Sequence, residues 1–361
     1  MKEEEKYIFG WSLIPYVGYK RFKAILSYFG DPKKAWSEFV NKDVFPSGFS
    51  ALLTKKIKNF VLKTDIDKEI DKVTKKGIRI ITFSSPDYPM LLKNTSSPPL
   101  VLYIRGELPD GNYISVVGTR KPSIYGINIA EKISKELSEY NVTVVSGMAR
   151  GIDTYAHRAT LRSRGKTVAV LGTGVDVVYP YENKKLYQEI IENGAVISEY
   201  PPGIGPKREH FPRRNRIIAG VSLGTLVVEA PEKSGALITA RFALEEGREV
   251  FAVPGQIDSR NFVGTNRLIR DGAKLVENAR NIIEEFPFIN WDRRSEMEDG
   301  QKNLRNKEEI IYKIINEEPK YIDIIAEESG IPIREVTSIL LSLELKRLIK
   351  EIGGKRYCRI K

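Results

Sequence analysis

The sequence predicts an α/β protein: a Rossmann-like, doubly wound, mostly parallel sheet between an N-terminal helical domain and a C-terminal winged helix. Three observations support this prediction. Apolar, β-branched runs alternate with amphipathic helical patterns through the middle of the chain, which is typical of a parallel sheet covered on both faces. Glycine-rich turns follow several of these runs. The two ends of the chain read as shorter helical blocks.

The N-terminal block, residues 1–75, is expected to form a helical domain of the SAM or helix-hairpin-helix kind. Phe22, Ile25 and Phe29 are spaced for one buried helix face. The stretch 13–18 (LIPYVG) precedes a basic helix, an order in which hairpin amides approach a phosphate. A small helical packing module explains the same pattern equally well.

The central block, residues 76–288, is predicted to hold the sheet. Continuous Val/Ile/Leu runs separated by helical patterns indicate strands buried on both faces. The expected strands are Ile78–Thr82, Leu100–Arg105, Ile114–Val117, Val142–Ser146, Thr167–Leu171, Ala195–Ser198, Thr225–Val228 and Glu249–Val253. Helices are expected at Ile124–Glu139, Thr154–Arg164 and Ala236–Glu246, among others.

A polar stretch without periodicity, residues 289–306, is interpreted as a linker. Residues 307–361 then follow the order of a winged helix-turn-helix: three helices and a two-stranded wing that turns at Gly353-Gly354. The third helix presents few polar residues for reading bases, and the last sixteen residues hold seven Lys/Arg against one Glu. Contacts to a DNA backbone or to a protein partner therefore suit this domain better than sequence readout.

Composition narrows the function. The 361 residues carry a net charge of +11, which favours a polyanionic partner, nucleic acid first. One cysteine, Cys358, and two histidines, His157 and His210, exclude a disulfide framework and a thiolate or His-rich metal site. No signal peptide or membrane-length apolar run is present in the sequence. We expect a cytoplasmic protein with no membrane association, no metal and no cofactor.

Several glycine turns are expected at the carboxyl ends of the strands, where an open parallel sheet forms its binding crevice. Glycines there let backbone N–H groups approach a phosphate, and an arginine adds charge. The candidate phosphate-binding residues are Gly118, Thr119 and Arg120, then Ser146 and Gly147, and at a helix start Ser234 and Gly235. Neither a Walker loop nor a GxGxxG fingerprint occurs, which disfavours an ATPase and a dehydrogenase.

The densest basic segment, residues 206–220, has five Lys/Arg against one Glu around an aromatic residue. Charge that tracks a phosphate backbone, beside a ring on which a base stacks, suits single-stranded nucleic acid. Phe211 is the candidate stacking residue. The candidate phosphate contacts are Lys207, Arg213, Arg214, Asn215 and Arg216.

No catalytic arrangement is evident in the sequence. Asp153 and His157 share a helix face, which we interpret as a cap and a core residue. Glu229 ends a strand without an obvious second acid for glycosidic chemistry. The sequence is therefore expected not to be that of an enzyme.

Five segments resemble the DNA-processing protein A (DprA/Smf) family: VVGTRKPSIYG, SGMARGIDTYAH, FPRRNRIIAG, VVEAPEKSGALITARFALEEGREVFAVPG and GTNRLIRDGA, between Val116 and Ala273. The resemblance implies a single-stranded DNA-binding protein without turnover, which protects incoming strands and loads the RecA recombinase in natural transformation. It implies a phosphate pocket at Gly118, Thr119 and Arg120 and at Phe211, Pro212, Arg214 and Asn215. It also implies a homodimer, whose interface maps onto Leu268, Ile269 and Leu275.

Two other functions remain open at this point. A Rossmann-like nucleotide phosphoribohydrolase also uses glycine turns, and Gly224-Thr225 with Glu229 is similar to its Gly-Thr-x-x-Glu element, with one residue more between Thr225 and Glu229. The preceding Pro-Gly-Gly run of such enzymes is missing, however. The other alternative is a transcription regulator, in which the winged helix binds duplex DNA and the sheet domain senses a nucleotide.

Overall fold

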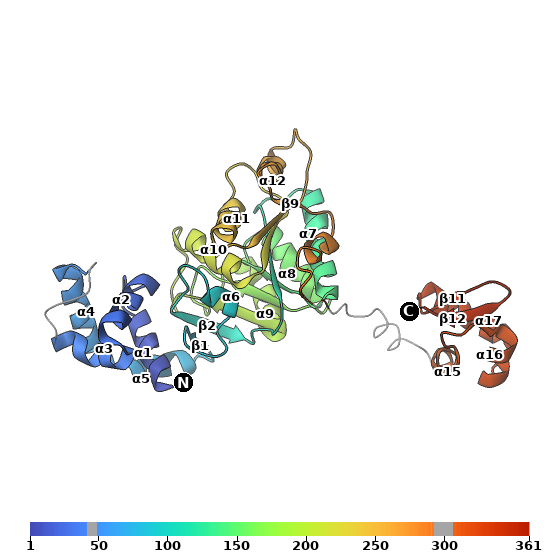
Figure 1. Ribbon diagram of the computed structural model, residues 1–361, viewed down its shortest axis with the longest axis horizontal. Helices are drawn as coiled ribbons and strands as arrows, with labels where there is room; N and C mark the ends of the chain where they lie inside the picture. The colour runs from blue at the N-terminus through green and yellow to red at the C-terminus, as the bar shows by residue number, and fades with distance from the viewer. Residues whose placement is uncertain (42–48, 290, 292–305, 361) are drawn as a thin grey trace. The chain divides into compact units, whose positions relative to one another are not determined.

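The computed structural model describes residues 1–41, 49–289, 291 and 306–360 (Figure 1). The chain divides into two compact units, residues 1–292 and residues 293–361. The predicted linker, residues 289–306, lies outside the described residues except for Ile289, Trp291 and Asn306. No helix in the described part of the chain is long and apolar enough to cross a membrane.

Over residues 1–41 and 49–75, the first unit begins with five α-helices and a short 3-10 turn. They are α1 (Glu3–Ser12), α2 (Tyr19–Phe29), α3 (Pro32–Glu38), η1 (Phe39–Asn41), α4 (Ala51–Lys63) and α5 (Ile66–Thr74). Trp11 and Phe22 are buried among these helices. The burial of Phe22 agrees with its predicted place on the apolar face of its helix. This core continues into the sheet, since the ring of Phe9 meets that of Tyr103 edge-on with centroids 6.4 Å apart.

The sheet of the first unit has the order β1-β2-β6-β5-β4-β3-β7-β8-β9 within the described residues. Its strands are β1 (Arg79–Thr82), β2 (Val101–Gly106), β3 (Tyr113–Val117), β4 (Thr143–Ser146), β5 (Thr167–Val170), β6 (Gly194–Ser198), β7 (Gly224–Val227), β8 (Glu249–Ala252) and β9 (Lys274–Leu275). From β6 to β9 every neighbouring pair is parallel, while β1 and β2 add an antiparallel edge. The eight predicted strands and the mostly parallel sheet are confirmed; β9 was not predicted.

Helices cover both faces of the sheet. Val116 packs in a cluster with residues of α7 and α8, whereas its neighbour Val117 packs with residues of α10 and α11. This alternation explains why the strands read as continuous apolar runs. The helices and turns are α6 (Met90–Lys93), α7 (Ile124–Glu139), α8 (Ile152–Arg162), η2 (Tyr181–Asn183), α9 (Lys184–Asn193), α10 (His210–Val221), α11 (Gly235–Glu245), η3 (Arg260–Phe262), α12 (Val263–Arg270) and α13 (Ala279–Ile283).

The order in which strands are added to the sheet reverses at β3. From this strand the chain adds β4, β5 and β6 on one side and later β7, β8 and β9 on the other. Such a switch point opens a crevice at the carboxyl ends of the strands. The loops after β3, β4, β5 and β7 are therefore positioned to meet there.

The second unit is a winged helix. Its elements are α15 (Asn306–Ile314), β10 (Lys320–Tyr321), α16 (Ile322–Ser329), α17 (Ile333–Leu345), β11 (Ile349–Glu351) and β12 (Arg356–Arg359). The predicted helices and wing are present, and β10 adds a strand to the wing, in the order β10-β12-β11. Gly330 ends α16 in the left-handed conformation, with φ of +64°, which glycine adopts without strain. Cys358 is buried in this unit.

Candidate functional site

A cleft of about 780 Å³ opens where the loops at the carboxyl ends of the parallel strands meet. It is bordered by the β3–α7 turn, the loop before α8, the loop after β5, and the first turns of α10 and α11. Nine of the sequence-predicted residues border it: Gly118, Thr119, Arg120, Phe211, Pro212, Arg214, Asn215, Ser234 and Gly235.

The cleft is strongly cationic. Four exposed basic side chains and one buried arginine border it: Arg120, Lys121, Arg208, Lys233 and Arg214. Among the described lining residues the one acid is Asp153, which is buried. Converging positive charge in a cavity focuses the electrostatic field and attracts a polyanion.

Close backbone packing holds the β3–α7 turn in place. Thr119 N donates to the Glu229 carbonyl at 2.7 Å, and Ile152 N donates to the Thr119 carbonyl at 3.2 Å. Gly151 has a φ of +79°, and a Cβ there would lie 2.3 Å from that Thr119 oxygen. The backbone of the turn is thus fixed, while the Arg120 side chain is exposed beside the cleft.

Arg214 forms the floor of the cleft and is nearly buried, with 4% exposure. Its Nη1 donates to the Gly147 carbonyl at 2.8 Å and to the Val170 carbonyl. Burial lowers the pKa of Arg214 to about 10, while the neighbouring Asp153 opposes this shift. The guanidinium stays charged at neutral pH, but these bonds tie it to the ends of β4 and β5. Arg214 therefore supports the cleft rather than reaching out of it as the sequence predicted.

Ser146 and Gly147 do not border the cleft, contrary to the predicted role as phosphate donors. The Ser146 hydroxyl is fully buried and donates to the Val116 carbonyl at 2.6 Å. Gly147 N donates to Asp153 Oδ2 at 3.1 Å, and a Cβ on Gly147 would lie 2.5 Å from the Arg214 guanidinium. Their polar groups are used to build the turn, so none of these donors is left for a ligand.

Phe211 lies in the first turn of α10 and borders the cleft. Its ring centroid is 5.4 Å from that of Tyr179, and the Arg120 guanidinium lies 5.8 Å from it. Two aromatic rings and a planar cation thus gather at one place. This is the set of groups on which unpaired bases stack.

Asn215, Ser234 and Gly235 join α10 to the start of α11. Asn215 Nδ2 donates to the Gly235 carbonyl at 3.2 Å, and its Oδ1 accepts from Arg214 Nε at 3.2 Å. The Ser234 hydroxyl caps α11 by accepting from Ala236 N at 3.2 Å. The side chain of Asn215 is therefore used within the protein, whereas the helix start at Gly235 faces open space.

Three predicted phosphate contacts, Lys207, Arg213 and Arg216, lie outside the cleft lining. Arg216 is mostly buried: it pairs with Glu199 and donates to the Ser97 carbonyl at 2.7 Å. Arg213 is exposed and lies 3.5 Å from the same carboxylate. Arg216 thus has a structural role, because α10 turns its side chain away from the cleft.

Several residues that border the cleft were not predicted from the sequence, among them Lys121, Tyr179, Arg208, Lys233 and Asn261. Arg208 was part of the basic segment but was not singled out, and Lys233 directly precedes the predicted Ser234. Tyr179 comes from the loop before η2 and Asn261 from η3, and neither segment carries a motif of its own, so only the fold brings them here.

The acid–base residues noted in the sequence are structural. His157 is fully buried, its Nδ1 lies 2.7 Å from Thr167 Oγ1, and burial lowers its pKa to about 3. Glu229 is also fully buried and accepts from Ser123 Oγ at 2.7 Å and from Asn261 Nδ2 at 2.6 Å. Across the described residues no three His, Cys, Asp or Glu side chains gather to hold a metal ion.

The predicted interface residues lie at the far edge of the sheet. Leu268 and Ile269 on α12 are partly buried, and Leu275 on the edge strand β9 is 41% exposed. Ile257, in the loop before η3, is also exposed. The three predicted residues thus belong to neighbouring elements at one edge.

Comparison with known proteins identifies related chains. The family model described as DNA recombination-mediator protein A matches residues 79–287, and the DprA winged helix domain matches residues 296–355. Protein Smf of Synechocystis is 33% identical, with 99% of each chain covered. Protein Smf of Escherichia coli is 34% identical over 94% of this chain and 96% of its own.

Two solved structures are similar in fold. DNA processing protein A from Streptococcus pneumoniae superposes with a TM-score of 0.67 at 35% identity, covering 80% of this chain and all of its own. DNA processing protein A from Helicobacter pylori, studied for its single-stranded DNA binding mode, gives a TM-score of 0.52 at 28% identity. It covers 58% of this chain and 95% of its own.

Proposed function

Since the chain belongs to the DNA recombination-mediator protein A family, we propose that it binds single-stranded DNA in the cationic cleft. In this proposal it protects incoming single strands and loads a RecA-type recombinase onto them during natural transformation. The observation that carries the proposal is the convergence of four exposed cations with Phe211 and Tyr179 around one cavity.

Each part of the cleft has a role in this proposal. Arg120, Lys121, Arg208 and Lys233 neutralise backbone phosphates, and the start of α11 adds backbone donors at a helix N-terminus. Phe211 offers its ring to an unpaired base, a contact worth about 1–3 kcal/mol per base. A duplex keeps its bases stacked inside, so this contact favours the single strand.

The same site argues against a nucleotide hydrolase. The Glu229 carboxylate, which the sequence offered as a candidate for glycosidic chemistry, is fully buried and accepts from the Ser123 hydroxyl at the start of α7. A carboxylate held in this way does not reach a substrate. The family description and the names of the relatives refer to recombination mediation and DNA processing, which fits a binding protein without turnover.

The surface of the winged helix suits the binding of a partner better than the sequence-specific DNA recognition of a transcription regulator. On α17, the Thr337 hydroxyl donates back to the Ile333 carbonyl at 2.8 Å, so it is engaged within the helix. Leu341 and Leu345 on the same helix are 58% and 78% exposed. A helix that reads a major groove instead presents polar side chains to base edges.

A homodimer completes the proposal. The edge strand β9 pairs with β8 on one side. Its exposed Leu275, together with Leu268 and Ile269 of α12, offers an apolar patch beside Arg267 and Arg270. Two copies that meet here would place two clefts on one strand of DNA, which raises the affinity through avidity.

Fluorescence anisotropy with labelled dT oligonucleotides and a matched duplex, at several salt concentrations, tests the proposal. We expect tight, salt-dependent binding with a clear preference for the single strand. Equal or stronger binding of the duplex would contradict the cleft model and favour the winged helix as the DNA contact. Once single-strand binding is established, filament assembly by RecA on strands coated with a single-strand-binding protein tests the loading step.

A further inference from the structure

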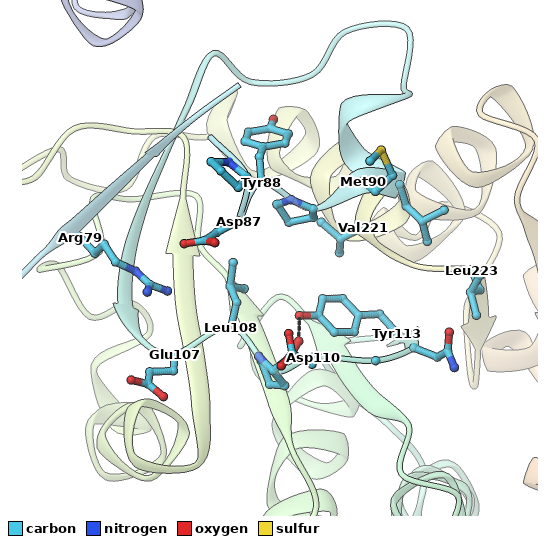
Figure 2. Close-up of a pocket in the computed structure, with 16 residues that line it drawn as sticks. Arg79, Asp87, Tyr88, Met90, Glu107, Leu108, Asp110, Tyr113, Val221 and Leu223 are labelled. Carbon is cyan, nitrogen blue, oxygen red and sulfur yellow. Dashed lines mark hydrogen bonds between the residues drawn. The ribbon is translucent and has the colours of Figure 1, made fainter. Parts of the chain in front are cut away.

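Figure 2 shows a second cavity, whose volume is about 740 Å³. It lies at the opposite end of β3 from the cleft. Tyr113, the first residue of β3, borders this cavity, whereas Val117, the last residue of β3, borders the cleft. Its walls include residues 86–91, which lead into α6, and the loop 107–112. We call this cavity the acidic groove.

Three exposed carboxylates, Asp87, Glu107 and Asp110, stand at the groove. Within the described residues none of the three carboxylate groups has a hydrogen bond or an ion pair. Arg79 is the single cation among the lining residues, and it forms no ion pair with them. In a chain with a net charge of +11, this groove is a local concentration of negative charge that lacks a partner.

Most of the other side chains that line the groove are apolar, and two of its tyrosines are anchored by hydrogen bonds. Tyr88 and Tyr113 are buried, and their hydroxyls donate to the Pro99 carbonyl at 2.7 Å and to the Pro109 carbonyl. Figure 2 shows Met90, Val221 and Leu223 on one side of the hollow and the charged side chains of Arg79, Asp87 and Glu107 on the other. Met90 is 67% exposed, so an apolar contact surface is available next to the charges.

We propose that the acidic groove docks a basic segment of a protein partner. A lysine or arginine of that segment lies between the three carboxylates, and an adjacent aliphatic side chain packs against Met90 and Leu223. Charge complementarity selects this occupant, because the carboxylates repel a nucleic-acid phosphate and attract a cation. The fixed tyrosines and prolines keep the groove formed before binding, which lowers the entropic cost.

The placement of the groove has a functional consequence. Because the groove and the cleft border opposite ends of β3, a partner in the groove leaves the cleft open for DNA. The groove therefore recruits a second protein to a chain that is holding a nucleic acid. This inference does not depend on DNA binding, and the two fail separately.

Isothermal titration calorimetry of the full chain with the peptide acetyl-Arg-Leu-Arg-Leu-Arg-amide tests the proposal. We expect D87N/D110N to weaken binding of this peptide about tenfold, since two rim charges are lost. E192Q/D258N is the matched control: it removes two exposed carboxylates that lie outside the groove, and the affinity should change less than about twofold. The peptide acetyl-Arg-Ala-Arg-Ala-Arg-amide should bind more weakly than the leucine peptide, because its side chains do not fill the apolar side.

Three results would overturn the proposal: no binding of the leucine peptide, equal losses in the two double variants, or equal affinity for the two peptides. The last two would show diffuse charge attraction rather than a groove. The affinity of D87N/D110N for a dT oligonucleotide should match that of the unmodified chain. If the peptide binds as expected while dT does not bind at all, the single-stranded DNA proposal fails and the groove remains.

Discussion

Replacement of Arg120 by alanine should flatten the salt dependence of single-strand binding. Four exposed cations border the cleft, and each neutralised phosphate contributes about −0.7 to the slope of log K against log salt for single strands. The unmodified chain should therefore give a slope of about −2.8 on a short dT oligonucleotide, and R120A a slope of about −2.1. Between 50 and 200 mM salt, these slopes correspond to affinity losses of about fiftyfold and about twentyfold.

Anisotropy titrations of a labelled dT octamer at four or more salt concentrations measure both slopes. Arg213→Ala is the matched control, because Arg213 is exposed and equally charged but lies outside the cleft lining, next to Glu199. We expect R213A to keep the slope of the unmodified chain. If R213A and R120A flatten the salt slope equally, the strand follows the basic segment as a whole and the cleft assignment is refuted.

Three further predictions concern the support of the cleft, the buried histidine and the dimer. Arg214→Gln should lower the free energy of unfolding by about 3–5 kcal/mol in urea titrations, because the Gly147 and Val170 carbonyls and Asp153 lose a buried cation. A variant that is as stable as the unmodified chain but no longer binds DNA would contradict this supporting role. The pKa of His157 is about 3 in the folded chain and 6.5 when unfolded, so stability falls as pH drops through this window, by about 2 kcal/mol from pH 8 to pH 5. His157→Leu should remove that part of the pH dependence of stability, measured by unfolding followed by tryptophan fluorescence. An unchanged profile of stability against pH would show that protonating His157 does not destabilise the folded chain. Leu275→Arg should shift the monomer–dimer equilibrium toward monomer in sedimentation velocity. The control Leu62→Arg, at a leucine that is 68% exposed against 41% for Leu275, should not; a dimer that survives L275R has another interface.

The sequence predicted the sheet because its pattern has a simple physical cause. Strands such as β3 and β5 are buried on both faces, so nearly every residue must be apolar, and the run is visible without any structure. Helix starts were visible for a similar reason, since Ser123 and Ser234 cap α7 and α11 with their hydroxyls. The two-residue strands β9 and β10 were not predicted, because two residues carry no periodicity.

The direction in which a polar side chain points was the part that sequence did not determine. Arg213, Arg214 and Arg216 are nearly adjacent, yet α10 turns one to solvent, one to the cleft floor and one toward Glu199. Ser146 and Gly147 occupy a glycine turn like that of Gly118, but their donors are used by Val116 and Asp153. The direction of these side chains depends on the packing of segments that are distant in the sequence. The same packing places Tyr179 and Asn261 at the cleft.

A crystal structure of the chain with a dT hexamer tests the central claim most directly. If the single strand binds in the cleft, we expect phosphates next to Arg120 and Lys121 and a thymine stacked on Phe211, with the acidic groove free of DNA. A strand bound on the winged helix, or one that crosses the cleft edge without touching Arg120 or Phe211, would contradict the account.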